Sequence, residues 1–212
     1  MSLQQQLKAT HQSFLNDAPE AATLFDQDTE QTIQNEIDKH ALKTGDKAPS
    51  FTLPDQLGRE VSSEQLLNDG VLVVSFYRGG WCPYCNLELR ALQTHQNKIK
   101  ALGANLVAIS PQLPDESMST VEKNALTFTV LSDVDNVIAR QFGLVFTLSE
   151  KLRPYYQGFG IDLAATNGSD SFELPIPATY VINQDGVIIA DYVNADYKQR
   201  LEPELILQAL VA

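Results

Sequence analysis

The two cysteines of this chain, Cys82 and Cys85, lie together in the stretch GGWCPYCNLE. The thiolate form of cysteine attacks disulfides and peroxides, and a helix N-terminus lowers the pKa of a thiol through its unpaired N–H groups and positive dipole end. Pro83 suits the first helical position, which places Cys82 at the start of a helix. Cys85 follows one turn later, so either sulfur can close a disulfide once the other is oxidised. The spacing predicts a nucleophile paired with a resolving thiol.

The pair allows two other interpretations. Free cysteines are often buried as small hydrophobic residues, but here both cysteines of the chain fall together beside Gly-Gly-Trp. A structural zinc site needs four ligands, and the three histidines are scattered at His11, His40 and His95. We therefore expect a redox pair, without a metal or an organic cofactor.

Three neighbouring residues each allow two interpretations. Arg78 either stabilises a thiolate or binds peroxide, or it is a solvated charge. Trp81 either packs over the sulfurs or is an ordinary core aromatic residue. Glu88 lies one turn after Cys85, where it either orients a reacting group or belongs to a solvated helix face.

An alternation of strands and helices surrounds the motif. The run 71–76 is dense in β-branched and apolar residues and predicts a central strand buried on both faces. Strands alternating with helices predict an α/β fold with parallel first crossovers. The expected elements after the motif are a helix over 83–100, a strand over 105–110, a helix over 115–124, a strand over 128–131 and a helix over 134–142.

The remaining segments frame this unit. Residues 51–53 and 59–61 predict a short hairpin. Residues 179–183 and 187–192 predict an antiparallel hairpin, followed by a last helix over 202–212. The insertion 144–175 is too long for a plain connector. Its aromatic segment 153–159 lines a substrate groove, covers the sheet or forms a dimer contact, and we favour the last two slightly.

The N-terminal part differs from the rest of the chain in its amino-acid composition. Residues 1–43 are polar, contain no valine and place apolar residues at helical spacing, which predicts a helical extension broken near Pro19. We expect residues 44–212 to form the main domain.

Composition narrows the possible partners and location. Fifteen Lys and Arg against 27 Asp and Glu give a net charge of −12, which repels nucleic acid and anionic membranes. No basic segment followed by an apolar core opens the chain, and no run of eighteen apolar residues occurs in it. We expect a cytoplasmic protein that binds neither nucleic acid nor membrane.

Several segments resemble one family. GDKAPSFTLPD at 45–55, ISP at 109–111, LSD at 131–133 and ATYVIN at 178–183 resemble the alkyl hydroperoxide reductase C / thiol-specific antioxidant family, the peroxiredoxins. YRGGWCPYC at 77–85 is similar to the subgroup with a thioredoxin-type Cys-x-x-Cys motif. The resemblance implies a thioredoxin-like fold, in which helices flank a central mixed sheet.

This sequence matches the family pattern Pro-x-x-x-Thr-x-x-Cys only in part. Cys85 matches the cysteine that attacks peroxide, whereas Cys82 and Arg78 stand where the threonine and proline would be. Glu88 matches a glutamate common in the family, and the family's peroxide-activating arginine falls at Pro177. The threonine, the proline and the arginine of the family pattern are thus all replaced.

A second analogy assigns the cysteines differently. Pro83 and Tyr84 between the cysteines make a glutaredoxin-type motif, and Pro177 stands where thioredoxins carry a cis-proline. This analogy makes Cys82 the exposed nucleophile and Cys85 the buried resolver.

Three functions follow from these observations. The first is an antioxidant thiol peroxidase that reduces hydrogen peroxide or organic hydroperoxides through a sulfenic acid on Cys85 and a Cys82–Cys85 disulfide, with a thioredoxin-like or glutathione-type reductant. The second is a thiol-disulfide oxidoreductase with Cys82 as nucleophile. The third, ranked below both, is a redox-sensing or docking protein. A homodimer is compatible with each of them.

Overall fold

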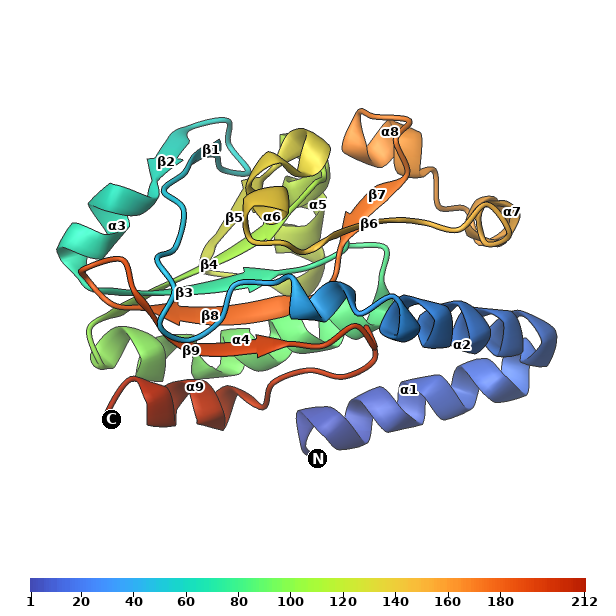
Figure 1. Ribbon diagram of the computed structural model, residues 1–212, viewed down its shortest axis with the longest axis horizontal. Coiled ribbons are helices and arrows are strands. Elements are labelled where there is room, and N and C mark those ends of the chain that lie inside the picture. The colour runs from blue at the N-terminus through green and yellow to red at the C-terminus, as the bar shows by residue number, and fades with distance from the viewer.

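A central five-stranded mixed sheet organises the computed structural model, which describes residues 1–212 (Figure 1). Its strand order is β5-β4-β3-β8-β9, where β3 pairs in parallel with β4 and antiparallel with β8. The run VLVVSF forms β3 because it can be buried on both faces of the sheet, as predicted. The strands are β3 (Val71–Phe76), β4 (Ala104–Ser110), β5 (Thr129–Ser132), β8 (Ala178–Ile182) and β9 (Ile188–Val193).

Helices cover both faces of the sheet, which gives the thioredoxin-like fold that the sequence predicts (Figure 1). One core lies between the sheet and α4 (Pro83–Ala101) together with α9 (Pro203–Ala209). The other lies between the sheet and α3 (Ser63–Asp69) together with α6 (Val137–Gln141). Helix α5 (Pro114–Asn124) and the hairpin of β1 (Thr52–Pro54) and β2 (Glu60–Ser62) complete this part.

The chain begins with two helices, α1 (Leu3–Asp17) and α2 (Pro19–Gln34), which we call the N-terminal helical pair. The break at Pro19 is where the sequence predicts it. Leu3 and Leu7 of α1 are buried in the same core cluster as the two cysteines. The N-terminal helical pair therefore packs directly on the part of the molecule that carries the thiols.

The insertion 144–175 has structure of its own. It contains the two-stranded sheet of β6 (Val145–Thr147) and β7 (Glu173–Pro175), and the short helices α7 (Arg153–Gly158) and α8 (Leu163–Asn167). Its apolar residues form a third cluster with Phe25 of α2. The insertion and the N-terminal helical pair thus share one core.

Two elements differ from the sequence prediction. The seven-residue helix α3 was not predicted, because SEQLLND is too short for a clear period. The helix expected over 134–142 is a 3₁₀ turn, η2 (Val134–Asn136), followed by α6. The turn arises because Asp135 and Asn136 adopt positive φ angles of 63° and 55°. The Asp133 carboxylate then accepts hydrogen bonds from the first N–H groups of α6.

None of the helices is both long enough and apolar enough to span a lipid bilayer.

Candidate active site

The thiol motif lies where β3 ends and α4 begins, as the sequence predicts. Cys82 is the N-cap residue of α4 and Pro83 is its first residue. The preceding loop needs both of its glycines: a Cβ at Gly79 would lie 2.3 Å from Trp81 Nε1, and one at Gly80 would lie 2.2 Å from Thr120 Oγ1. The loop that leads into α4 is therefore so tightly packed that neither glycine can carry a side chain without displacing a neighbour.

Both cysteines are reduced and almost completely buried, with exposed fractions of 1% for Cys82 and 0% for Cys85. Their environments differ. Cys82 lines a cavity of about 500 Å³, whereas Cys85 does not. A small molecule in this cavity therefore contacts Cys82 rather than Cys85.

The electrostatic environment also distinguishes the two thiols, because it favours ionisation of Cys82 over ionisation of Cys85. Burial raises the pKa of Cys82, but a hydrogen bond with Cys85 and the charges of Arg78 and Arg200 outweigh it and lower the pKa to about 6. Burial, the same hydrogen bond and the negative charge of Cys82 raise the pKa of Cys85 well above its usual value. Cys82 is the thiolate of the pair and Cys85 is the thiol.

Arg78 is one source of this asymmetry. Its side chain has an exposed fraction of 4%, and its guanidinium donates to the Tyr156 hydroxyl. The guanidinium carbon also lies 5.2 Å from the Trp81 ring centre and 4.2 Å from that of Tyr197. The interpretation of Arg78 as a solvated charge is therefore wrong, because this cation is held among aromatic rings beside Cys82.

Glu88 and Arg200 form a buried ion pair beneath Cys85. Arg200 Nε donates to Glu88 Oε2 at 2.6 Å, and Arg200 Nη2 donates to Cys85 Sγ at 3.5 Å. Burial raises the pKa of Glu88 to about 7, although the charge of Arg200 acts in the opposite direction. The solvated-face interpretation of Glu88 is wrong. Sequence reasoning missed Arg200, which follows the last strand in no recognisable motif.

The other predicted site residues are close to the pair. Trp81 packs edge-on against Tyr156 at 5.3 Å and lies under Arg78. Tyr84 is buried and its hydroxyl lies 3.4 Å from His11 Nδ1. Trp81 and Tyr84 both line the cavity.

Pro177 is buried at the strand end beside the active-site loop, because the next residue, Ala178, pairs with Phe76. The chain contains no cis peptide bond, so Pro177 does not reproduce the cis-proline of the thioredoxin analogy.

The cavity is built mainly from aromatic side chains, and its lining comes from four helices and three loops. Arg78 is its one basic residue. Its lining comprises Thr10, Phe14, Phe25, Arg78, Trp81, Cys82, Pro83, Tyr84, Tyr156, Phe159, Gly160, Ile161 and Tyr197. No three side chains of the His, Cys, Asp and Glu types converge in a way that would hold a metal ion.

Comparison with known sequences identifies one family. The model of the AhpC/TSA family matches residues 44–191. Peroxiredoxin Bcp of Escherichia coli K12 is 37% identical over 103 residues, which is 49% of this chain and 65% of that protein. The chain therefore aligns with slightly less than two thirds of that relative. A relative from Mycobacterium tuberculosis H37Rv with a provisional peroxiredoxin name is 30% identical over 152 residues, covering 71% of this chain and 85% of the relative.

Comparison with solved structures agrees on the fold. The crystal structure of peroxidoxin BcpB from Mycobacterium tuberculosis superposes with a TM-score of 0.63 at 24% identity. The superposition covers 80% of this chain and 97% of that one. The N-terminal helical pair and Arg200 both lie outside the residues that the family model matches.

Proposed function

Because the chain belongs to the AhpC/TSA family, we propose that it is a thiol-dependent peroxidase that works through Cys82 and Cys85. The observation that carries this proposal is the position of the buried pair between two buried arginines, with Cys82 lining a cavity. The cations stabilise a thiolate, and the cavity admits a small substrate.

The geometry favours Cys82 as the first nucleophile. The family pattern puts the attacking cysteine at Cys85, but Cys82 has the lowered pKa and faces the cavity. In the first step the Cys82 thiolate attacks a peroxide oxygen and the O–O bond breaks. Water or an alcohol leaves after taking up a proton, and Cys82 becomes a sulfenic acid.

Loss of the negative charge on Cys82 prepares the second step. That charge is one of the causes that raise the pKa of Cys85, so forming the neutral sulfenic acid makes Cys85 easier to ionise beside Arg200. The Cys85 sulfur then attacks the Cys82 sulfur, the S–O bond breaks and water leaves. Two thiols from a reductant later restore the dithiol, and their two sulfurs leave as a disulfide.

A second function, thiol-disulfide exchange, uses the same asymmetry. In that case the Cys82 thiolate attacks a substrate disulfide, and Cys85 resolves the mixed disulfide. The observation that favours it is the direction of the two pKa shifts, lowered for Cys82 and raised for Cys85, which matches the thioredoxin-type assignment of the two cysteines.

Rapid mixing with peroxide separates these functions. The unmodified chain, Cys82→Ser and Cys85→Ser are each reduced, mixed with hydrogen peroxide or an organic hydroperoxide, and treated with dimedone to trap sulfenic acid for mass spectrometry. We expect fast peroxide consumption by the unmodified chain and a single fast turnover in Cys85→Ser, with the adduct on Cys82. Cys82→Ser should be slow.

Two results would change the proposal. Fast turnover by Cys82→Ser with an adduct on Cys85 would restore the order given by the family pattern. Slow peroxide consumption by all three proteins, together with a rapid reaction of Cys82 with a small disulfide, would establish thiol-disulfide exchange instead.

A further inference from the structure

The N-terminal helical pair forms part of the wall around Cys82. Thr10 and Phe14 of α1 and Phe25 of α2 line the cavity that Cys82 faces. Phe25 stacks on Tyr156 of α7 with ring centres 5.7 Å apart, and Phe14 packs edge-on against Phe25 at 5.5 Å. The rings of α1, α2 and α7 thus make a continuous aromatic cover over the motif.

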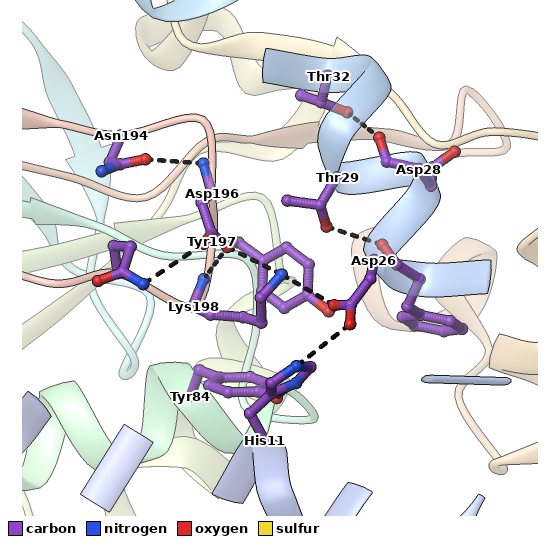
Figure 2. Close-up of polar contacts among 12 residues, drawn as sticks. His11, Asp26, Asp28, Thr29, Thr32, Tyr84, Asn194, Asp196, Tyr197 and Lys198 are labelled. Carbon is purple, nitrogen blue, oxygen red and sulfur yellow. Dashed lines mark hydrogen bonds and ion pairs between the residues drawn. The ribbon is translucent and has the colours of Figure 1, made fainter. Parts of the chain in front are cut away.

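Two ion pairs of Asp26 hold the N-terminal helical pair against the active-site side of the molecule (Figure 2). Asp26 of α2 lies 3.2 Å from His11 Nε2 on α1 and 3.2 Å from Lys198 Nζ on the loop after β9. The other ring nitrogen of His11 faces the hydroxyl of Tyr84, which lies between the two cysteines in sequence. Asp26 therefore joins α1, α2 and the 194–198 loop at one point.

Hydrogen bonds and apolar packing also hold the start of α1 against the main domain. The N–H groups of Leu3 and Gln4 donate to the Glu202 carboxylate at 3.2 and 2.9 Å. Leu3 and Leu7 are buried against α4, with exposed fractions of 3% and 2%. The first two turns of α1 are therefore docked on α4 and on the start of α9.

Reduction of a Cys82–Cys85 disulfide requires a thiolate to touch a sulfur and displace the other one. A thiol on the surface of a partner protein carries its surrounding surface with it, whereas Cys82 is only 1% exposed and side chains of α1 and α2 line the cavity that leads to it. A cavity of about 500 Å³ is instead of the size that holds small molecules. Its one basic residue, Arg78, attracts an anionic group.

From this geometry we propose that the N-terminal helical pair restricts the reductant of the Cys82–Cys85 disulfide to a small thiol that carries a carboxylate and enters this cavity. The inference rests on the proposed function only in that the cycle passes through this disulfide. The small thiolate attacks the Cys82 sulfur, the S–S bond breaks and Cys85 leaves as a thiolate beside Arg200. A second small thiolate then attacks the mixed disulfide, which frees Cys82 and releases the reductant as its disulfide.

The test measures disulfide reduction without any peroxide, so failure of the peroxidase proposal leaves it intact. Diamide oxidises the full-length protein, and reduction is followed with dithiothreitol, with glutathione and with reduced thioredoxin. The same rates are measured for Asp26→Ala, which removes the ion pairs of Asp26 with His11 and Lys198. The control is Asp17→Ala, which removes an exposed carboxylate at the end of α1 that makes no ion pair.

We expect thioredoxin to reduce Asp26→Ala at least tenfold faster than the unmodified protein, while the rate with dithiothreitol changes less than twofold. Asp17→Ala should behave as the unmodified protein. Equal rates with thioredoxin for the unmodified protein and Asp26→Ala would overturn the proposal.

Two comparisons on the unmodified chain keep the proposal testable if Asp26→Ala does not fold. Iodoacetamide should alkylate reduced Cys82 at least tenfold faster, relative to a free thiol, than a polyethylene-glycol maleimide does. 3-Mercaptopropionate should reduce the disulfide at least threefold faster than the cationic thiol cysteamine, after correction for the thiolate fraction of each. Equal rates within either pair would contradict the proposed selection by size or by charge.

Discussion

Arg200 Nη2 donates a hydrogen bond to the Cys85 sulfur at 3.5 Å across a sequence separation of 115 residues. The same guanidinium binds Glu88 on α4, the helix that contains Cys85 and has Cys82 as its N-cap. By the resemblance to the family, an arginine is expected at the position that Pro177 occupies in this chain. Arg200 supplies a buried cation from another segment, and it lies against the resolving cysteine.

Replacing Arg200 with methionine should slow disulfide reduction. Cys85 leaves as a thiolate in that step, and without Arg200 the thiolate is less stable and leaves more slowly. Without Arg200, the buried Glu88 carboxyl takes up a proton and loses its hydrogen-bond partner, which costs roughly 1–3 kcal/mol of unfolding free energy. Stopped-flow reduction by dithiothreitol and urea denaturation measure the two effects.

A paired variant separates chemistry from stability. Arg200→Met combined with Glu88→Leu removes both members of the ion pair, and most of the lost stability should return. The slow reduction should remain, since the cation beside Cys85 is still absent. Recovery of the reduction rate in the double variant would show that Arg200 acts only by holding the fold.

The pH dependence of alkylation reports the ionisation of Cys82. Because hydrogen bonding and nearby cations lower the pKa of Cys82 to about 6 despite its burial, its thiolate is present at pH 7 and is lost as the pH falls through about 6. The rate of iodoacetamide alkylation at Cys82, assigned by mass spectrometry, should therefore have its midpoint near pH 6. Arg78→Gln should move the midpoint to higher pH.

Arg78→Lys keeps the positive charge and serves as the control for this shift. Its midpoint should remain closer to that of the unmodified protein than the midpoint of Arg78→Gln. A midpoint near the value of a free cysteine, about 8.5, in the unmodified protein would show that Cys82 is not activated.

Gly143→Ala should destabilise the protein strongly. Gly143 has a φ of 74°, and a Cβ there would lie 2.3 Å from the carbonyl oxygen of His40. Gly103 has a φ of 76° with no atom within 4 Å of a Cβ, so Gly103→Ala measures the backbone cost alone, about 1–2 kcal/mol. Urea denaturation should show a clearly larger loss for Gly143→Ala. Equal losses would mean that the segment at His40 moves freely away.

Leu7→Ala tests whether the N-terminal helical pair unfolds together with the rest of the chain. Leu7 is 2% exposed in the core cluster that contains both cysteines, and a buried Leu→Ala change costs roughly 2–5 kcal/mol. One shared transition should shift when unfolding is followed by circular dichroism and by thiol accessibility. Lys8→Ala, at an exposed position of the same helix, should leave both curves unchanged. Separate transitions would show that α1 and α2 fold independently.

The fold was largely predictable because its central elements have strong local signals. VLVVSF at 71–76 can only be buried, Pro19 must interrupt a helix, and the alternating strands and helices fix the layers. The elements that were not predicted lack such signals. Helix α3 is short, and the turn at 134–136 depends on positive φ angles that the sequence does not reveal.

The site was predictable as far as the motif reaches. Cys82, Cys85, Arg78 and Trp81 share one loop and the helix that follows it, so their sequence spacing fixes their proximity. Arg200 was missed because its contact with Cys85 depends on how the chain returns after β9. The contacts of α1 and α2 with the active-site cavity also join residues that are far apart in the sequence. The polar sequences of these helices give no indication of the surface on which they pack.

The two sulfurs belong to the same core cluster as Leu3, Leu7 and Ile206. Oxidation and unfolding therefore form a closed thermodynamic cycle, in which the reduction potential of the pair is tied to the difference in stability between the dithiol and disulfide forms. A packing change that favours one form by about 1.4 kcal/mol must shift the two-electron potential by about 30 mV. The helices α1 and α9, which contribute no reacting atom, thus help to set the potential at which the thiols operate.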